Sequence, residues 1–393
     1  MRKITGSVLI LTALLAILGS AVAVFAKSTP NVSSVDPLTT HFATPDFILK
    51  TKIGSLSPNV SGFSPAQFKK AYGINLLNNK GTGITVAIID ACGNAHAQSD
   101  LNKYDTTFGL PATTIKVVKP QGTPCSNPTG WGVETDLDIQ MVHAIAPNAT
   151  IVLEAAKSAS FNNLINAAKD AYINHGATVI SMSFGGGEFT GETGATADGV
   201  FSTGNSKGVS FTASSGDSGC GAQYPATSPF VTSVGGTSLK TKADGTYVSE
   251  SAWSGSGGGL SAFESRPSYQ KGFNSSTKRG IPDVAMVANP NTGVRVYDSD
   301  FGGFIVVGGT SVAAPMWAGV LALTNQKRTS SMKNADIELY HVASNSTKYT
   351  KDFHDITTGS AGGACKAKAG YDLVTGLGTP ASNNLVPDLI AAP

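Results

Sequence analysis

With 393 residues, the chain has room for one large α/β domain or two small ones. Its 28 Lys and Arg nearly balance its 26 Asp and Glu, so no basic patch suggests nucleic acid as a partner. Only 14% of the residues are charged and 45 are glycine, a composition that is compatible with acidic surroundings but does not establish them.

The first 26 residues have the pattern of a secretory signal peptide. Two basic residues precede an apolar run, Val8–Leu18, and small residues follow up to Ala26. This run is short for a bilayer span, so we expect cleavage after Ala26 or Ala23 rather than a membrane anchor. We therefore expect a secreted, extracellular protein that has no membrane association after signal cleavage.

Residues 27–61 are polar and contain four prolines, which is typical of a short extended arm. Ser64 then caps a predicted helix over residues 65–72, with Pro65 in its first turn. We expect one domain from residue 62 to residue 393.

From residue 82, strand-like and helix-like segments alternate, which predicts an α/β fold with a doubly wound, mostly parallel sheet and helices on both faces. The predicted strands are 85–90, 115–118, 150–154, 178–183, 209–214 and 230–234. The predicted helices are 134–146, 161–175, 196–207 and 311–326. Shorter β-rich segments are expected at 246–253 and 293–297.

Four cysteines in an exported chain suggest up to two disulfides, with three possible pairings. Cys92 with Cys125 is the first choice because both lie in the N-terminal third, and Cys220 and Cys365 remain. The spacings match no zinc site.

A glycine-rich octapeptide, residues 308–315, lies between a strand-like run and a helix-like run. Ser311 would sit where the first amides of the helix gather, and these amides could stabilise an oxyanion formed by attack of this serine. The alternative is that Thr310 or Ser311 only caps the helix. A nucleophilic role requires a base elsewhere in the chain.

Two acidic residues, Glu134 and Asp138, are four apart and would share one helix face. Like charges at this spacing repel unless they share a proton, and a solvated acidic helix start is the alternative. Asp90 ends a predicted strand, as the Asp of an Asp/His/Ser triad would, but none of the six histidines has a matching context. His143 would lie on the opposite face from Glu134 and is interpreted as a packing or surface residue.

These motifs together resemble the sedolisins, or serine-carboxyl peptidases, of the subtilisin-like superfamily. The similarity rests on Glu-x-x-Leu-Asp from Glu134 to Asp138, on Ser-Gly-Asp-Ser-Gly around Asp217 and on Gly-Thr-Ser ending at Ser311, and it extends from about residue 62 to the end. It implies a subtilisin-like fold and an acid-acting endopeptidase that hydrolyses peptide bonds in proteins through an acyl-enzyme on Ser311. Glu134 would be the base, Asp138 its proton-sharing partner and Asp217 a protonated oxyanion donor.

A C-terminal loop carries the second resemblance. From composition alone, the acidic residues at 355 and 372 favour a pair of solvated turns. Similarity to the sedolisin calcium loop instead implies one structural Ca²⁺, held by the side chains of Asp355 and Asp372 and by the carbonyls of Ile356, Lys368 and Gly370. Lys368 stands where the family often has glycine.

Two glycine-rich segments, Ser183–Gly187 and Trp253–Gly258, are expected to line a cleft for extended protein and peptide substrates, although ordinary sheet-end loops are the alternative. The expected protein is a monomer. Two other functions remain open: a subtilase with a conventional triad, and a catalytically silent secreted binding protein on the same fold. Sedolisins usually carry a long propeptide, whereas about 36 residues separate the expected signal cut from this domain. Either no such segment is needed, or the arm occupies the cleft, or a separate chain does the work.

Overall fold

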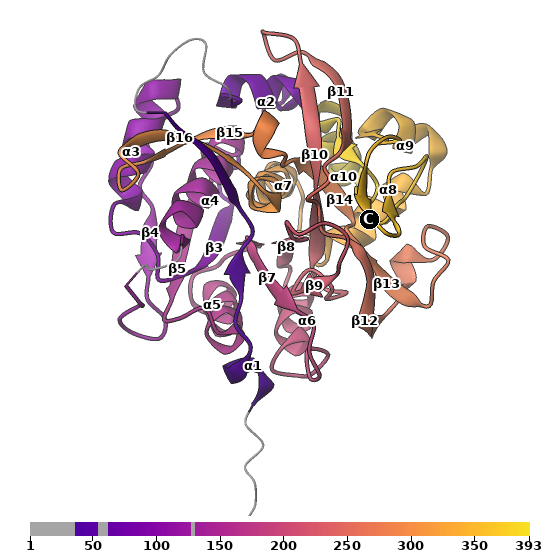
Figure 1. The fold of residues 1–393 in the computed structure, drawn as a ribbon, viewed down its shortest axis with the longest axis horizontal. Helices are drawn as coiled ribbons and strands as arrows, with labels where there is room; N and C mark the ends of the chain where they lie inside the picture. Colours follow the sequence, from indigo (N-terminus) through magenta and orange to yellow (C-terminus); the bar gives the residue numbers. More distant parts are fainter. Residues whose placement is uncertain (1–35, 54–61, 127–129) are drawn as a thin grey trace, which may run out of the picture. The chain divides into compact units, whose positions relative to one another are not determined.

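The computed structural model describes residues 36–53, 62–126 and 130–393. Its centre is an eight-stranded sheet in the order β11-β10-β8-β6-β3-β5-β4, with β14 beside β10 (Figure 1). Every pairing in this sheet is parallel except that of β10 with β11. The predicted doubly wound, mostly parallel sheet is confirmed. Its strands are β3 (Thr85–Ala91), β4 (Lys116–Val118), β5 (Thr150–Ala156), β6 (Val179–Met182), β8 (Ser210–Ser214), β10 (Thr232–Thr241), β11 (Tyr247–Ala252) and β14 (Val284–Val287).

Alternating side chains of β3 separate the two hydrophobic cores. Val86 and Ile88 pack in the core that contains α4 and α7, whereas Ala87 and Ile89 pack in the core that contains α5 and α6. Strands buried on both faces are the expected consequence of helices on both sides of a parallel sheet. The main helices are α3 (Ala97–Phe108), α4 (Trp131–Ile145), α5 (Phe161–Asn174), α6 (Asp198–Ser206) and α7 (Thr310–Asn325).

Helices α4 and α7 are buried along their whole length. A glycine in α7 lets them approach closely, because a Cβ on Gly319 would lie 2.6 Å from side-chain atoms of Ile145. Glu134 and Asp138 are therefore in the interior, and the solvated helix start considered above is wrong.

Several elements were not predicted. Helices α3 and α8 to α10 are absent from the predicted elements, and β10 continues well past residue 234. The other helices are α1 (Pro37–Thr40), α2 (Pro65–Ala71), α8 (Ala335–Ala343), α9 (Ser346–Asp352) and α10 (Ser382–Ala391), with 3₁₀ turns at η1 (Ile74–Leu76), η2 (Ser268–Gln270) and η3 (Pro290–Thr292). The other strands are β1 (Thr44–Pro45), β2 (Ile48–Ile53), β7 (Phe184–Gly187), β9 (Gln223–Tyr224), β12 (Gly259–Ser265), β13 (Lys278–Ile281), β15 (Val294–Asp298), β16 (Gly303–Gly308), β17 (Phe353–His354), β18 (Ser360–Gly362), β19 (Cys365–Lys366) and β20 (Thr379–Pro380).

Residues 36–53, which belong to the expected polar arm, form α1, β1 and β2. Strand β1 pairs antiparallel with β7, and β2 pairs antiparallel with β16. In Figure 1 this segment is the indigo ribbon that runs from α1 past β7 towards β16. The expected signal peptide, residues 1–26, lies outside the described residues.

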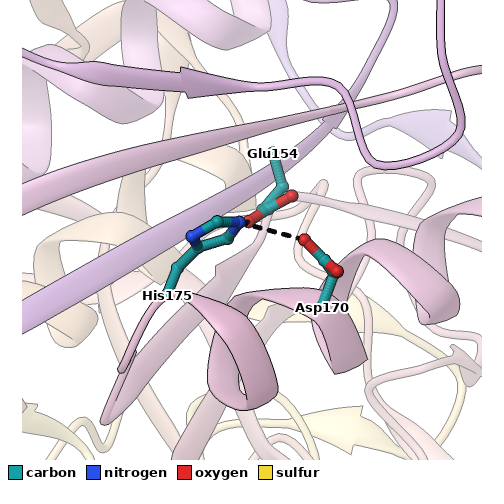
Figure 2. Close-up of side chains that lie close together, drawn as sticks. All are labelled: Glu154, Asp170 and His175. Carbon is teal, nitrogen blue, oxygen red and sulfur yellow. Dashed lines mark ion pairs between the residues drawn. The ribbon is translucent and has the colours of Figure 1, made fainter.

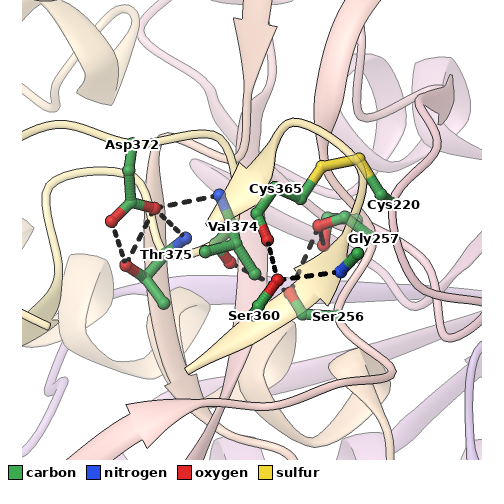
Figure 3. The surroundings of a disulfide bond; sticks show 10 residues. Cys220, Ser256, Gly257, Ser360, Cys365, Asp372, Val374 and Thr375 are labelled. Carbon is green, nitrogen blue, oxygen red and sulfur yellow. Dashed lines mark hydrogen bonds between the residues drawn. A yellow bond between two sulfur atoms is a disulfide. The ribbon is translucent and has the colours of Figure 1, made fainter. Parts of the chain in front are cut away.

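Two disulfides link the four cysteines. Cys92–Cys125 is confirmed, and Cys220–Cys365 joins the loop after β8 to β19 (Figure 3). Among the helices that the structure describes, none is both long and apolar enough to cross a membrane.

Candidate active site

Ser311 is the second residue of α7, directly after a turn that only glycine can make. Gly309 has φ +111°, and a Cβ there would lie 2.4 Å from Asp217 Oδ2 and 2.3 Å from the carbonyl oxygen of Asp46. L-residues rarely adopt this backbone conformation. The Ser311 side chain is buried and its hydroxyl donates to the carbonyl oxygen of Ser183 at 3.2 Å.

Glu134 lies in the first turn of α4, and its carboxyl group is completely buried. Burial raises the pKa of Glu134 well above its usual value, and the negative charges of Asp138 and Asp90 raise it further. The nearby Ser311 hydroxyl, as a potential donor, opposes this shift. In the structure that hydroxyl donates to the Ser183 carbonyl oxygen, and neither carboxyl oxygen of Glu134 has a hydrogen-bond partner in the described residues. Glu134 is therefore a candidate base beside the nucleophile, and rotation of the Ser311 hydroxyl would be needed to bring the two into hydrogen bonding.

Asp138 lies one turn further along α4 and is also completely buried. Burial is the main reason that its pKa is raised well above the usual value, and the charge of Asp90 adds to it. The hydrogen bond from the Ser183 hydroxyl, at 2.7 Å, and the neighbouring Glu134 carboxyl act in the opposite direction. Two buried carboxyls this close together are expected to share one proton.

Asp217 follows β8 and reaches the start of α7. Its Oδ1 atom accepts hydrogen bonds from the backbone N–H and the hydroxyl of Thr310, at 2.8 and 3.0 Å. Its Oδ2 atom is buried and has no hydrogen-bond partner in the described residues. Burial, and next the charge of Asp46, raise the pKa of Asp217 well above the usual value. A protonated Oδ2 can donate a hydrogen bond beside Gly309.

Asp46, in the arm, was not expected at this site. Its carbonyl oxygen accepts a hydrogen bond of 3.0 Å from the Ser311 N–H. Its side chain accepts hydrogen bonds from the Ser214 hydroxyl, at 2.7 Å, and from the Gln223 amide. Burial raises its pKa to about 6. No local pattern in the sequence places Asp46 at the site, because its position depends on the pairing of β1 with β7, which are distant in the chain.

Asp90 is the penultimate residue of β3 and is buried, and burial raises its pKa to about 7. The Asp90 charge raises the pKa values of both Glu134 and Asp138.

All six histidines lie in the described residues, and no hydrogen bond or ion pair there joins one of them to Ser311, Glu134 or Asp138. His143 is buried, which confirms the packing role rather than the surface one. Its Nε2 atom lies 2.8 Å from the Pro111 carbonyl oxygen and 3.3 Å from Asp105 Oδ1. Figure 2 shows His175 with Asp170 and Glu154, in a separate cluster. A conventional triad has no histidine here.

The chain is similar to known peptidases over most of its length. A model of the Subtilase family matches residues 112–371. Kumamolisin from Bacillus sp. (strain MN-32) is 32% identical over 79% of this chain, and sedolisin from Pseudomonas sp. (strain 101) is 30% identical over 81% of it. A solved structure of Pseudomonas sedolisin, complexed with two molecules of pseudo-iodotyrostatin, covers 84% of this chain and 98% of its own, with a TM-score of 0.76 and 27% identity.

The chain belongs to the sedolisin family, on the subtilisin-like fold. A further relative, tripeptidyl-peptidase 1 from Dictyostelium discoideum, is 29% identical over 82% of the chain. The chain spans about 60% of the length of each of these three sequence relatives.

The C-terminal loop of this sedolisin brings two carboxylates to one short segment. Both oxygens of Asp355 accept from the Gly370 N–H, at 3.2 and 3.0 Å, and Asp372 Oδ2 accepts from the Lys368 N–H at 3.1 Å. Thr375 holds Asp372 through its N–H and hydroxyl (Figure 3). The donor set expected here, with the Ile356 carbonyl, consists of oxygen atoms only, which suits calcium.

Proposed function

We propose that this sedolisin is a secreted, acid-acting serine-carboxyl endopeptidase. The observation that carries the proposal is that Ser311, the buried Glu134–Asp138 pair and Asp217 Oδ2 all lie around the start of α7. A silent binding protein would not need four such groups together. The two disulfides support export to an oxidising compartment.

In the proposed mechanism, Ser311 Oγ attacks the substrate carbonyl carbon while Glu134 takes the hydroxyl proton. The oxyanion accepts hydrogen bonds from the Ser311 N–H and from protonated Asp217. Glu134 then gives the proton to the leaving amine, and water hydrolyses the acyl-enzyme by the reverse use of the same groups. Asp138 orients Glu134 and holds part of its proton.

Acid action follows from the protonation states that this mechanism needs. The Glu134–Asp138 pair must have lost one proton, whereas Asp217 must keep its own. A free Asp has a pKa of about 3.9 and a free Glu of about 4.3. Burial raises the pKa values of all three groups, so we expect activity to extend above pH 4 and to disappear as rising pH ionises Asp217.

The arm favours endopeptidase over tripeptidyl-peptidase action. Asp46 lies at the nucleophile, and Thr44 is the third residue counted back from the Asp46 carbonyl. The chain continues beyond Thr44: the Ala43 N–H donates to the Ala159 carbonyl at 2.8 Å, and Phe42 pairs with Ser160. A site that releases tripeptides needs a block after the third residue, and this cleft accommodates chain there.

The test of the proposed function is digestion of a denatured protein from pH 3 to pH 8, with Ser311→Ala as control and mass spectrometry of the products. We expect internal cuts, greatest in acid and absent with Ser311→Ala. Ladders of tripeptides from the N-terminus would overturn the endopeptidase assignment. A maximum at pH 8 without decline would overturn the role of Asp217.

We also propose one structural Ca²⁺ held by Asp355 and Asp372 with the carbonyls of Ile356, Lys368 and Gly370. When bound, the ion would cross-link this loop, and at a hundred times its Kd it would stabilise the fold by about 2.7 kcal/mol.

Chelation with EDTA should therefore lower the Tm of Ser311→Ala protein, and added Ca²⁺ should restore it. Asp372→Asn, which keeps the side-chain shape, should remove most of this response, whereas Asp244→Asn, at an exposed turn, should not. Elemental analysis should find about one calcium per chain. A Tm that is indifferent to EDTA would contradict the site.

A further inference from the structure

Residues 42–46 of the arm run beside β7 to the turn before Ser311, with β1 at Thr44–Pro45. The Ala43 N–H bonds to Ala159 on one side, and Thr44 faces Gly185 of β7 on the other. The Asp46 N–H donates to the carbonyl oxygen of Ser183 at 3.4 Å. An extended peptide recognised by backbone pairing on both sides is the way a protease holds its substrate.

The Asp46 carbonyl occupies the position of a scissile carbonyl. It accepts from the Ser311 N–H at 3.0 Å. Its oxygen and Asp217 Oδ2 both lie within 2.4 Å of the point where a Gly309 Cβ would be, and the Cα of Phe47 lies 2.6 Å from the same point. The Asp46–Phe47 peptide bond therefore passes directly over the nucleophile turn, with its oxygen towards both proposed oxyanion donors.

Phe47 lies near the start of α4, the helix that carries Glu134, which is proposed to protonate the leaving amine. A Cβ on Gly130 would lie 2.9 Å from the Phe47 ring. Gly130 is the cap of α4, and its carbonyl accepts from the Glu134 N–H at 3.1 Å. The amine released from Phe47 would thus form near Glu134, which must give it a proton.

The Asp46 side chain fills a pocket with fixed donors. The side-chain amide nitrogen of Gln223 donates one hydrogen bond to the Asp46 carboxylate and another, of 3.2 Å, to the Ser214 carbonyl oxygen. Both of its N–H groups therefore have an acceptor. Gln223 is wedged between two glycines, because a Cβ on Gly185 or Gly216 would lie 2.0 or 2.9 Å from its amide atoms. Only 7% of Asp46 is exposed. These donors suit a short carboxyl or amide side chain.

We propose that Ser311 cuts the chain's own Asp46–Phe47 bond, and that the pocket of Ser214 and Gln223 selects Asp on the acyl side of the bond in this and other substrates. This inference rests on the proposed function. Ser311 Oγ forms an ester with the Asp46 carbonyl, the C–N bond breaks, and the proton from Ser311 passes through Glu134 to the Phe47 amine. Water then hydrolyses the ester, which leaves a carboxyl group on Asp46 and restores Ser311.

The first experiment follows the full chain at pH 4 by intact mass and N-terminal sequencing. Wild-type protein should gain Phe47 as its N-terminus at a rate independent of protein concentration, and Ser311→Ala should stay uncut there. Asp46→Leu should slow this cut about 100-fold or more, because the pocket donors lose their partner. Asp46→Asn should be cut. Asp36→Leu, the same change on the same arm outside the cleft, should be cut at the wild-type rate.

The second experiment compares quenched peptides with Asp or Leu before the scissile bond. The processed enzyme should favour Asp in kcat/KM, and Gln223→Leu should remove most of this preference while it still cuts the Leu peptide, which shows that the variant is folded. If wild-type protein digests other proteins but keeps its Asp46–Phe47 bond, the self-cleavage is wrong and the proposed function stands. If it favours Leu, the pocket assignment is wrong. If it digests nothing at any pH, the proposed function is wrong, and this inference with it.

Discussion

Replacing Glu134 with Gln is expected to lower kcat/KM for a peptide substrate by at least about 10³-fold. Gln has nearly the same shape but cannot take the proton of the Ser311 hydroxyl. The loss should appear at every pH, because no protonation state of Gln provides a base. Steady-state hydrolysis of a quenched peptide from pH 3 to pH 8 measures it, and unchanged circular dichroism shows that the fold is retained.

Glu154→Gln is the matched control. Glu154 is another completely buried Glu, and burial raises its pKa to about 8. It belongs to the cluster with Asp170 and His175 (Figure 2) and has no part in the proposed mechanism. This variant should keep its activity within a few-fold. An active Glu134→Gln enzyme, or equal losses in the two variants, would contradict the assignment of Glu134 as the base.

The proposed catalytic residues could be selected from sequence because their signals are local. Glu134 and Asp138 share a face through helical spacing, and the turn before Ser311 is encoded by Gly309 next to it. What the sequence did not settle was burial: a solvated helix start and a buried acid pair have the same spacing. That difference depends on α7, which is more than 150 residues away in the chain and covers α4.

The position of Asp46 at the site could not be predicted from the sequence. Its position depends on β1 pairing with β7 and β2 pairing with β16, and each contact joins parts of the chain that are far apart. The arm is short and polar, and short strands at an edge carry little periodic signal. An arm in the cleft is one of the options that the sequence leaves open, but no pattern in it indicates which peptide bond would reach Ser311.

The second large expected effect is a higher free energy of unfolding in acid, caused by buried carboxyl groups. Burial raises the pKa of Asp90 and of Asp105 to about 7 and that of Glu154 to about 8. In the unfolded chain these groups titrate near pH 4. Between pH 4 and about 7–8, the folded protein therefore binds more protons than the unfolded one, and its free energy of unfolding decreases as the pH rises.

Two histidines, the buried His143 and the partly buried His354, act with the opposite sign. Burial lowers the pKa of His143, and it lowers that of His354 to about 4. Each opposes folding as the pH falls through about 6.5. The raised carboxyls outnumber them, and with 14% charged residues the chain gains little self-repulsion in acid. The carboxyls should dominate the balance.

We therefore expect the Tm of Ser311→Ala protein, which cannot digest itself, to be at least about 5 °C higher at pH 4.5 than at pH 8. Scanning calorimetry in buffers of equal ionic strength measures it. Glu154→Gln should reduce this difference, because Gln binds no proton on folding, whereas Asp36→Asn, at an exposed residue, should leave it nearly unchanged. A Tm that is equal or higher at pH 8 would mean that these carboxyls are ionised in the folded protein, and the same electrostatics could then not keep Asp217 protonated for catalysis.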